Sequence, residues 1–258
     1  MTISPPRLLI FDDYESLSRI AVEHTIFLAR TAVAERGQFT FALSGGGAPQ
    51  RLFELLAYPE YVEQISWPEM HIFWGDERCV PPDQEGSSYK QAYDAFLCKV
   101  PIPTRNIHRI RGELPPAEAA DDYARLLLEF VHLHPPTPLS LNKQDFPRFD
   151  LVLLGMGTDG HTASLFPGPI PDRERTSPTL PVTAHYGDRP ANRVSLTPLV
   201  FNTARNIFFL ATGAAKAETL HAVLNGSHDP EHLPAQRIQP ENGQVTWFVD
   251  QEAAKMLK

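Results

Sequence analysis

Short apolar runs that lack a clean alternation of apolar and polar residues recur along the chain and constrain its fold more than any other feature. A strand covered on both faces has this continuous apolar pattern, which is typical of parallel sheets. Helical spacing lies between several runs, first over 14–36, where Gly37 marks a stop, and again over 117–132 and 214–224. The runs expected to be strands are 7–11, 39–43, 70–75, 149–155, 193–196, 206–212 and 245–249. The pattern predicts a doubly wound α/β fold with a mostly parallel sheet.

The length of 258 residues is within the range of one α/β domain, so we expect residues 1–258 to form a single domain. The sequence has neither an internal repeat nor a heptad array. Two proline-rich segments, 134–148 and 167–181, are expected to be surface loops.

Composition and charge exclude several classes of protein. Hydrophobic residues make up 42% of the chain, yet no apolar run approaches the roughly 18 residues of a membrane helix. A net charge of −8 disfavours nucleic-acid binding, which needs a basic surface. Four consecutive apolar residues near the start are too few for a secretory signal, and the two cysteines, Cys79 and Cys98, form no disulfide framework or metal motif. We expect a cytoplasmic protein without a metal.

The segment LVLLGMGTDGHTASLFPG, residues 151–168, places an acid and a histidine directly after a buried strand. One interpretation is structural: the glycines supply positive φ angles, and Thr158 or Asp159 caps a following helix. The other is chemical, because ligands of open α/β sheets bind outside the carboxyl ends of the strands, where this segment would place His161.

The segment FALSGGGAPQRLFELLA, residues 41–57, runs from a strand through a glycine turn into a helix. Such a turn allows backbone N–H groups to approach a phosphate or an oxyanion closely. It has neither the GK[ST] ending of a Walker loop nor a GxGxxG pattern, so it does not indicate a nucleotide site. The candidate ligand-binding residues are Ser44, Gly45, Gly46 and Gly47.

A third strand ends in Gly75 and is followed by Asp76, Glu77 and Arg78. Solvated loop charges are one interpretation of this triplet. However, three strands now end in glycine and polar residues, and the carboxyl ends of parallel strands share one edge of the sheet. This agreement among three strand ends favours a common site over chance.

Two further cations complete the candidate site. Arg193 lies at the start of a predicted strand, and Lys216 lies in the first turn of a predicted helix. A lysine at that end of a helix is unfavourable against the helix dipole, and a bound anion would remove the penalty.

Taken together, these segments resemble the 6-phosphogluconolactonase family. The resemblance covers the chain from about residue 40 to residue 225; GMGTDGHTASLFPG is its most specific motif, and SGGG is its least specific. The matching segments are 43–47, 75–78, 155–167, 193–198 and 212–224.

The resemblance implies hydrolysis of 6-phosphoglucono-δ-lactone to 6-phosphogluconate, the second step of the oxidative pentose phosphate pathway, without a metal or an organic cofactor. It also implies a Rossmann-like three-layer α/β sandwich, shared with sugar-phosphate isomerases and deaminases. The partner would be the small phosphorylated lactone alone, with no nucleic acid and no membrane, and we expect a monomer or a weak dimer.

Lactone hydrolysis needs a base to activate water, donors for the oxyanion and a clamp on the phosphate. His161 is the best base in the sequence, because an imidazole is substantially neutral at cytoplasmic pH. Asp159 could orient the loop, and Asp76 could polarise His161 or hold a sugar hydroxyl; the sequence does not separate these roles.

The resemblance places Arg78, Arg193 and Lys216 where the family carries phosphate-binding cations, and Gly157 among the substrate-binding residues. Backbone N–H groups of the 45–47 turn would meet either the oxyanion or the phosphate. A nucleophilic serine is not expected, because Ser44 lacks the G-x-S-x-G elbow.

Two rival functions remain open. A glucosamine-6-phosphate deaminase or isomerase shares the G-x-D-G-H signature, but continues with phenylalanine, asparagine and glutamate, whereas Thr162 to Phe166 supply no carboxylate here. A sugar-phosphate sensor would keep the pocket and lack the chemistry.

Overall fold

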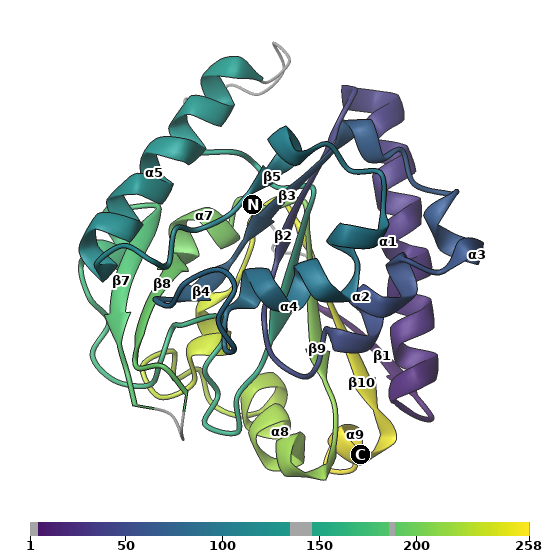
Figure 1. Cartoon of the computed structure of the whole chain (residues 1–258). Helices are drawn as coiled ribbons and strands as arrows, with labels where there is room; N and C mark the ends of the chain where they lie inside the picture. Colours follow the sequence, from purple (N-terminus) through teal and green to yellow (C-terminus); the bar gives the residue numbers. More distant parts are fainter. Residues whose placement is uncertain (1–4, 135–145, 186–188, 258) are drawn as a thin grey trace.

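A parallel sheet of seven strands forms the centre of the molecule, as the computed structural model shows for residues 5–134, 146–185 and 189–257 (Figure 1). Its strand order is β1-β10-β9-β6-β2-β3-β5, and every neighbouring pair is parallel. The predicted doubly wound fold is therefore confirmed. The strands are β1 (Arg7–Phe11), β2 (Phe39–Leu43), β3 (Met70–Trp74), β5 (Ile107–His108), β6 (Leu151–Gly155), β9 (Asn206–Ala211) and β10 (Gln244–Asp250).

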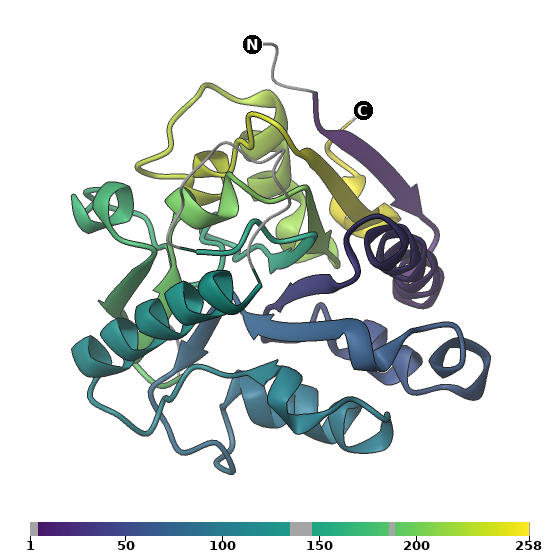
Figure 2. The same cartoon turned by 90° about the horizontal axis from the view of Figure 1, so that it is seen from above.

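Helices cover both faces of this sheet (Figure 2). The α-helices are α1 (Tyr14–Arg36), α2 (Gln50–Leu56), α3 (Pro59–Val62), α4 (Ser88–Ala95), α5 (Pro116–Leu133), α6 (Arg173–Thr176), α7 (Pro198–Phe201), α8 (Ala217–Asn225) and α9 (Gln251–Ala254). Short 3₁₀ turns are Trp67–Glu69, Leu97–Lys99, Thr104–Asn106, Ala214–Lys216 and Pro234–Arg237.

Two aromatic contacts assign the longest helices to opposite faces. His24 of α1 lies against Phe208 of β9, and Phe130 of α5 lies against Phe73 of β3. The strand register aligns Phe73 with Ile207, the neighbour of Phe208. Since successive side chains alternate between faces, α1 and α5 sandwich the sheet between them.

Helix α1 begins and ends where the sequence predicts. Asp13 accepts a hydrogen bond from the Ser16 N–H at 2.8 Å and caps the first turn. Gly37 ends the helix with φ of 76°, a left-handed conformation that favours glycine.

A smaller antiparallel sheet, which the sequence did not predict, lies beside the main one. Its strands are β4 (Asp76–Arg78), β8 (Asn192–Leu196) and β7 (Thr179–Thr183), in the order β4-β8-β7, and α5 packs against β7 and β8. The predicted strand 193–196 therefore exists but belongs to this second sheet.

One loop prediction is wrong, one alternative interpretation is excluded and one segment is not described. The segment 167–181 contains α6 and the beginning of β7, where Thr179 is fully buried. The charges of residues 76–78 are buried in β4, which pairs with β8, and this excludes the interpretation as solvated loop charges. Of the predicted loop 134–148, residues 135–145 lie outside the described part of the chain.

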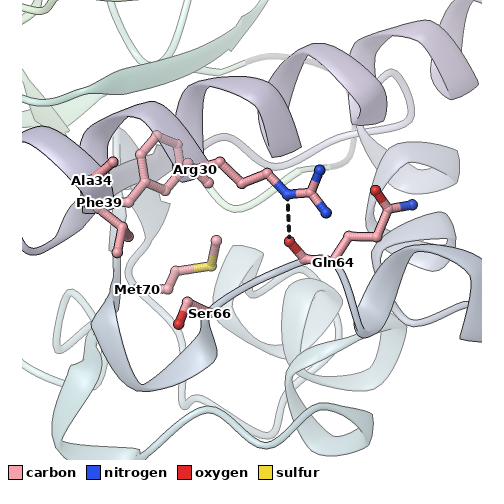
Figure 3. A pocket seen from close by; sticks show the side chains of 8 residues that line it. Arg30, Ala34, Phe39, Gln64, Ser66 and Met70 are labelled. Atoms are coloured by element: carbon pink, nitrogen blue, oxygen red, sulfur yellow. Dashed lines mark hydrogen bonds between the residues drawn. The ribbon is translucent and has the colours of Figure 1, made fainter.

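A hollow of about 220 Å³ lies between α1 and the segment that leads into β3 (Figure 3). Phe39 and Met70, which line it, are the first residues of β2 and β3, so the hollow lies at the amino edge of the sheet. Arg30 crosses it and donates to the Gln64 carbonyl at 3.1 Å. This is the edge opposite to the one where open α/β sheets bind ligands. Within the described ranges, no helix has the length and apolar character of a membrane span.

Candidate active site

The loop after β6 is a compact turn, and no helix starts in it. The Gly157 N–H donates to the His161 carbonyl at 2.8 Å, and the Gly160 N–H donates to the Gly157 carbonyl at 3.2 Å. Gly160 has φ of 82°, which favours glycine. Because the next helix begins only at Arg173, the interpretation of this segment as a helix cap is wrong.

His161 and Asp159 form a hydrogen-bonded pair in this turn. His161 Nδ1 lies 2.6 Å from Asp159 Oδ1, and the His161 backbone N–H donates to the same oxygen at 3.2 Å. A Cβ on Gly157 would lie 2.1 Å from His161 Nδ1 and 2.3 Å from Asp159 Oδ1, so only glycine leaves room for the pair. Burial raises the pKa of Asp159, but the hydrogen bond and charge of His161 outweigh it, and the pKa is lowered.

This pairing fixes the chemistry of the imidazole. An ionised carboxylate only accepts hydrogen bonds, so Nδ1 of His161 carries the proton and Nε2 is the basic atom. The sequence suggested Asp76 as a residue that could polarise His161 and Asp159 as one that could orient the loop; in the structure it is Asp159 that is hydrogen-bonded to the imidazole.

Asp76 is joined to the same loop by a different residue. It lies in β4, is 6% exposed and accepts a hydrogen bond from Ser164 Oγ at 2.7 Å. Ser164 in turn receives support from β8, since its N–H donates to Ser195 Oγ at 3.3 Å. The loop after β6 is thereby fixed to the small sheet, and sequence reasoning missed Ser164 as the link.

Arg193 is a buried cation whose hydrogen-bonding capacity is largely unused. It is 3% exposed, and in the part of the chain that the structure describes neither Nε nor Nη2 has a hydrogen-bond partner. Its guanidinium carbon lies 5.5 Å from the centre of the Phe166 ring, and Arg78 is its direct partner across the β4–β8 ladder. Burial lowers the pKa of Arg193, Asp76 opposes this shift and Arg78 adds to it. Two arginines side by side form a site that an anion would stabilise.

Arg78 is held in place by the chain that follows it. Its Nη1 donates to the Gly86 carbonyl at 2.8 Å and to Ser88 Oγ at 3.1 Å. Glu77, buried beside it, accepts a hydrogen bond from the Ser88 N–H at 2.6 Å. Burial raises the pKa of Glu77, and this hydrogen bond opposes the shift. A Cβ on Gly45 would lie 2.4 Å from Ser88 Oγ and 3.1 Å from Arg78 Nη1. Gly45 therefore allows β2 to approach the arginine site closely.

The glycine turn after β2 is partly occupied by its own protein contacts. Gly46, with φ of 100°, donates its N–H to Gln91 Oε1 at 2.9 Å and accepts from Gln91 Nε2 at 2.6 Å. Its N–H is therefore engaged in this structure, which differs from the predicted cradle of open donors. Tyr14 Oη donates to the Gly47 carbonyl at 2.9 Å, and Ser44 is buried at the end of β2. Gln91 and Tyr14 had no motif to identify them.

Lys216 lies at the same edge of the sheet but on another element. It ends the 3₁₀ turn after β9 and precedes the first residue of α8, as the sequence predicts, and it is partly exposed. Helix α8 touches the histidine loop, because Thr219 Oγ1 donates to the Thr158 carbonyl at 2.6 Å.

The described residues contain no group of three or more His, Cys, Asp or Glu side chains that could hold a metal ion. The fold and the site together define a doubly wound α/β protein that carries a histidine–carboxylate pair and an arginine pair at the carboxyl edge of its sheet. The chain matches, over residues 12–247, the family described as glucosamine-6-phosphate isomerases/6-phosphogluconolactonase. It belongs to this family.

Individual relatives agree with this membership. The probable 6-phosphogluconolactonase 4, chloroplastic, of Oryza sativa subsp. indica is 39% identical over 254 residues, which cover 97% of this chain and 76% of the relative. The 6-phosphogluconolactonase 3, chloroplastic, of Arabidopsis thaliana is 37% identical over 252 residues, which cover 97% of this chain and 75% of the relative.

Solved structures show the same fold. The 6-phosphogluconolactonase from Trypanosoma brucei has a TM-score of 0.83 and 25% identity, with 100% of both chains covered. A monomeric glucosamine-6-phosphate deaminase has a TM-score of 0.78 at 21% identity, with 97% of this chain and 99% of the other covered, and shows the fold alone. The predicted three-layer sandwich of the sugar-phosphate isomerases and deaminases is confirmed.

Proposed function

We propose that this chain hydrolyses 6-phosphoglucono-δ-lactone to 6-phosphogluconate in the oxidative pentose phosphate pathway. The observation that carries the proposal is the 2.6 Å pair of His161 Nδ1 and Asp159 Oδ1 at the carboxyl edge of the sheet. The relatives named as 6-phosphogluconolactonases support the choice of substrate. No separate observation favours a deaminase or a sensor.

In the proposed mechanism His161 acts first as a base and then as an acid. Its Nε2 takes a proton from water while the water oxygen attacks the lactone carbonyl carbon. Asp159 stabilises the imidazolium that forms, because its carboxylate already holds Nδ1. When the tetrahedral intermediate collapses, the bond from C1 to the ring oxygen breaks and His161 returns the proton to that oxygen. The product acid then ionises to 6-phosphogluconate.

The arginine pair is proposed to bind the phosphate. Arg193 brings two buried nitrogens that have no acceptor in the described chain, and Arg78 is its cross-strand neighbour. A phosphate accepts several charge-assisted hydrogen bonds at once and would offset the repulsion between the two guanidinium groups. Lys216, on the adjacent element, is proposed as the third phosphate contact.

The remaining predicted residues take supporting parts in this proposal. Asp76 holds a substrate hydroxyl through the oxygen that Ser164 does not use, and its charge balances the arginines. Ser44 and the backbone of Gly45 and Gly47 line the substrate. Gly157 leaves space for the His161–Asp159 pair.

The test generates the lactone in situ from glucose 6-phosphate with its dehydrogenase and follows its disappearance by NMR. Because the lactone opens spontaneously, the expected result is acceleration above the rate without protein, with loss of this acceleration in His161→Ala. Equal rates with and without the wild-type chain would overturn the proposal. We also propose a cytoplasmic location and a monomer or weak dimer, which fractionation and light scattering would test.

A further inference from the structure

Phe166 is the common neighbour of the two functional groups that the proposed reaction needs most. Its ring centre lies 4.7 Å from that of His161, with an angle of 31° between the planes. The guanidinium carbon of Arg193 lies 5.5 Å from the same ring centre. The position of one ring therefore affects both the proposed base and the proposed phosphate clamp.

The backbone of Phe166 is held by a buried arginine from the C-terminal part of the chain. Arg237 Nη2 donates to the Phe166 carbonyl at 3.1 Å and to the Gly168 carbonyl at 3.5 Å, while Nη1 donates to Glu174 at 2.8 Å. The side chains of Arg237 and Glu174 are 4% and 3% exposed. A buried ion pair of this kind carries a large desolvation cost and is weak evidence for a gain in stability.

The 3₁₀ turn that contains Arg237, Pro234–Arg237, also contacts the residue that precedes His161. The Ala235 N–H donates to the Gly160 carbonyl at 2.9 Å. Leu233, directly before the turn, packs so closely on Gly160 that a Cβ there would lie 2.9 Å from Leu233 Cδ2. The turn thus bonds to the residue before His161 and, through Arg237, to Phe166 after it.

We propose that Arg237, oriented by Glu174, is a positioning residue that sets the Phe166 ring and through it the His161 imidazole and the Arg193 guanidinium. The kinetic part of this inference rests on the proposed lactonase function. Displacement of reacting groups by about 1 Å is enough to slow a reaction strongly. The aromatic face also favours the Arg193 cation, whose charge is otherwise offset mainly by Asp76.

The test compares Arg237→Met, Arg237→Lys and Phe166→Leu with the matched control Arg148→Met. Arg148 also donates to two backbone carbonyls, Thr203 at 2.9 Å and Asn242 at 2.6 Å, but these are away from the histidine loop. Steady-state kinetics on the in situ lactone, normalised to the folded fraction, give kcat and KM. The imidazole NMR signals of His161, assigned with His161→Gln, report its position without any substrate.

We expect Arg237→Met and Phe166→Leu each to lower kcat and raise KM by about tenfold. Arg237→Met, which keeps the Phe166 ring, should also shift the His161 signals. The double variant Arg237→Met/Phe166→Leu should have kcat and KM values within about twofold of those of the more impaired single variant, because both substitutions act through one ring. Arg237→Lys should recover part of the loss, since one ammonium cannot reach all the acceptors of a guanidinium. Arg148→Met should leave kcat, KM and the His161 signals unchanged.

A purely structural role would appear as a lower Tm for Arg237→Met with kcat, KM and the His161 signals unmoved, and this result would overturn the inference. If Arg237→Met does not fold, Arg237→Lys decides through the His161 signals and Phe166→Leu through kcat and KM, since both keep a cation beside Glu174; unmoved signals in the first and unchanged kinetics in the second would equally overturn it. If the wild-type chain has no lactonase activity, the proposed function fails, and the His161 signals alone still decide the positioning role.

Discussion

Buried charge is treated differently at the two edges of the parallel sheet. At the amino edge, Asp150 is 5% exposed and accepts hydrogen bonds from the Thr40 N–H at 2.9 Å, from Thr40 Oγ1 at 3.0 Å and from Arg36 Nε at 3.1 Å. At the carboxyl edge, Arg193 is 3% exposed and keeps two nitrogens without acceptors among the described residues. A satisfied buried charge joins parts of the fold, whereas an unsatisfied one costs stability until a ligand supplies the missing partner. The comparison therefore gives a test of whether Arg193 is a structural charge or, as proposed, a charge that binds the phosphate.

The largest effect is expected for the base itself. His161→Ala should lower kcat by about 10²–10⁴-fold, which is the usual contribution of general acid–base catalysis, and should change KM little. Initial rates of lactone loss above the spontaneous background, at several lactone concentrations, give both constants.

A second histidine–aspartate pair provides the matched control for this variant. His232 Nδ1 lies 2.9 Å from Asp229, but both side chains are exposed. His232→Ala should leave kcat unchanged. A comparable loss of kcat in His232→Ala would mean that the place of a histidine–aspartate pair at the sheet edge does not identify the base.

The next largest effect is expected at the amino edge. Asp150→Ala should lower the free energy of unfolding by about 3 kcal/mol, because it leaves Thr40 and Arg36 without their buried acceptor. Urea unfolding followed by circular dichroism measures this loss. The kcat of the folded fraction should stay at the wild-type value, and a fall in kcat would remove the distinction between the two edges.

The corresponding substitution at the carboxyl edge, Arg193→Met, should affect substrate binding rather than stability. Arg193→Met removes a buried charge of which two nitrogens have no hydrogen-bond acceptor among the described residues, so stability should stay constant or rise by about 1 kcal/mol. KM should rise by about 10–100-fold, because the phosphate loses a charge-assisted contact. Urea unfolding and steady-state kinetics on the same preparation measure both; a destabilised variant with unchanged KM would assign Arg193 to the fold.

These two edges also differ in how far the sequence predicts them. Local signals were sufficient for α1, since its apolar residues recur at helical spacing and Gly37 marks its end within the same segment. They were also sufficient for six of the seven parallel strands, whereas the two-residue strand β5 was missed because it is too short for a pattern. They placed His161 directly after a strand end, where the structure has it.

The small sheet and its contacts depend on residues far apart in the chain. Strand β4 has three residues, too few for a periodic signal, and it becomes a strand only because β8 pairs with it. The partner of Asp76, Ser164, lies in another loop, and the role of Arg237 depends on its distance to Phe166. No single-sequence pattern reports such distances, so the charges were identified while their partners were not.

The smallest effect is expected from a pair of histidines beside the main sheet. His71 Nδ1 lies 3.1 Å from His108 Nε2, a hydrogen bond in which one ring donates its N–H and the other accepts through an unprotonated nitrogen. Burial lowers the pKa of His71 to about 4, with His134 and Arg105 adding to the shift. Burial and the charge of His71 lower the pKa of His108 to about 3.

Both folded pKa values lie below the value of about 6.5 for an unfolded histidine, so the unfolded chain binds more protons between these limits. The contribution of the pair to stability is therefore complete above pH 6.5 and declines as the pH falls towards 4. We expect a loss of about 1 kcal/mol between pH 7.5 and 5.5, after allowance for solvent screening, measured by urea unfolding at each pH. His71→Gln should flatten this dependence, whereas Arg193→Met should keep it, because Arg193 stays charged throughout. An equally steep dependence in His71→Gln would assign the acid sensitivity to groups other than His71.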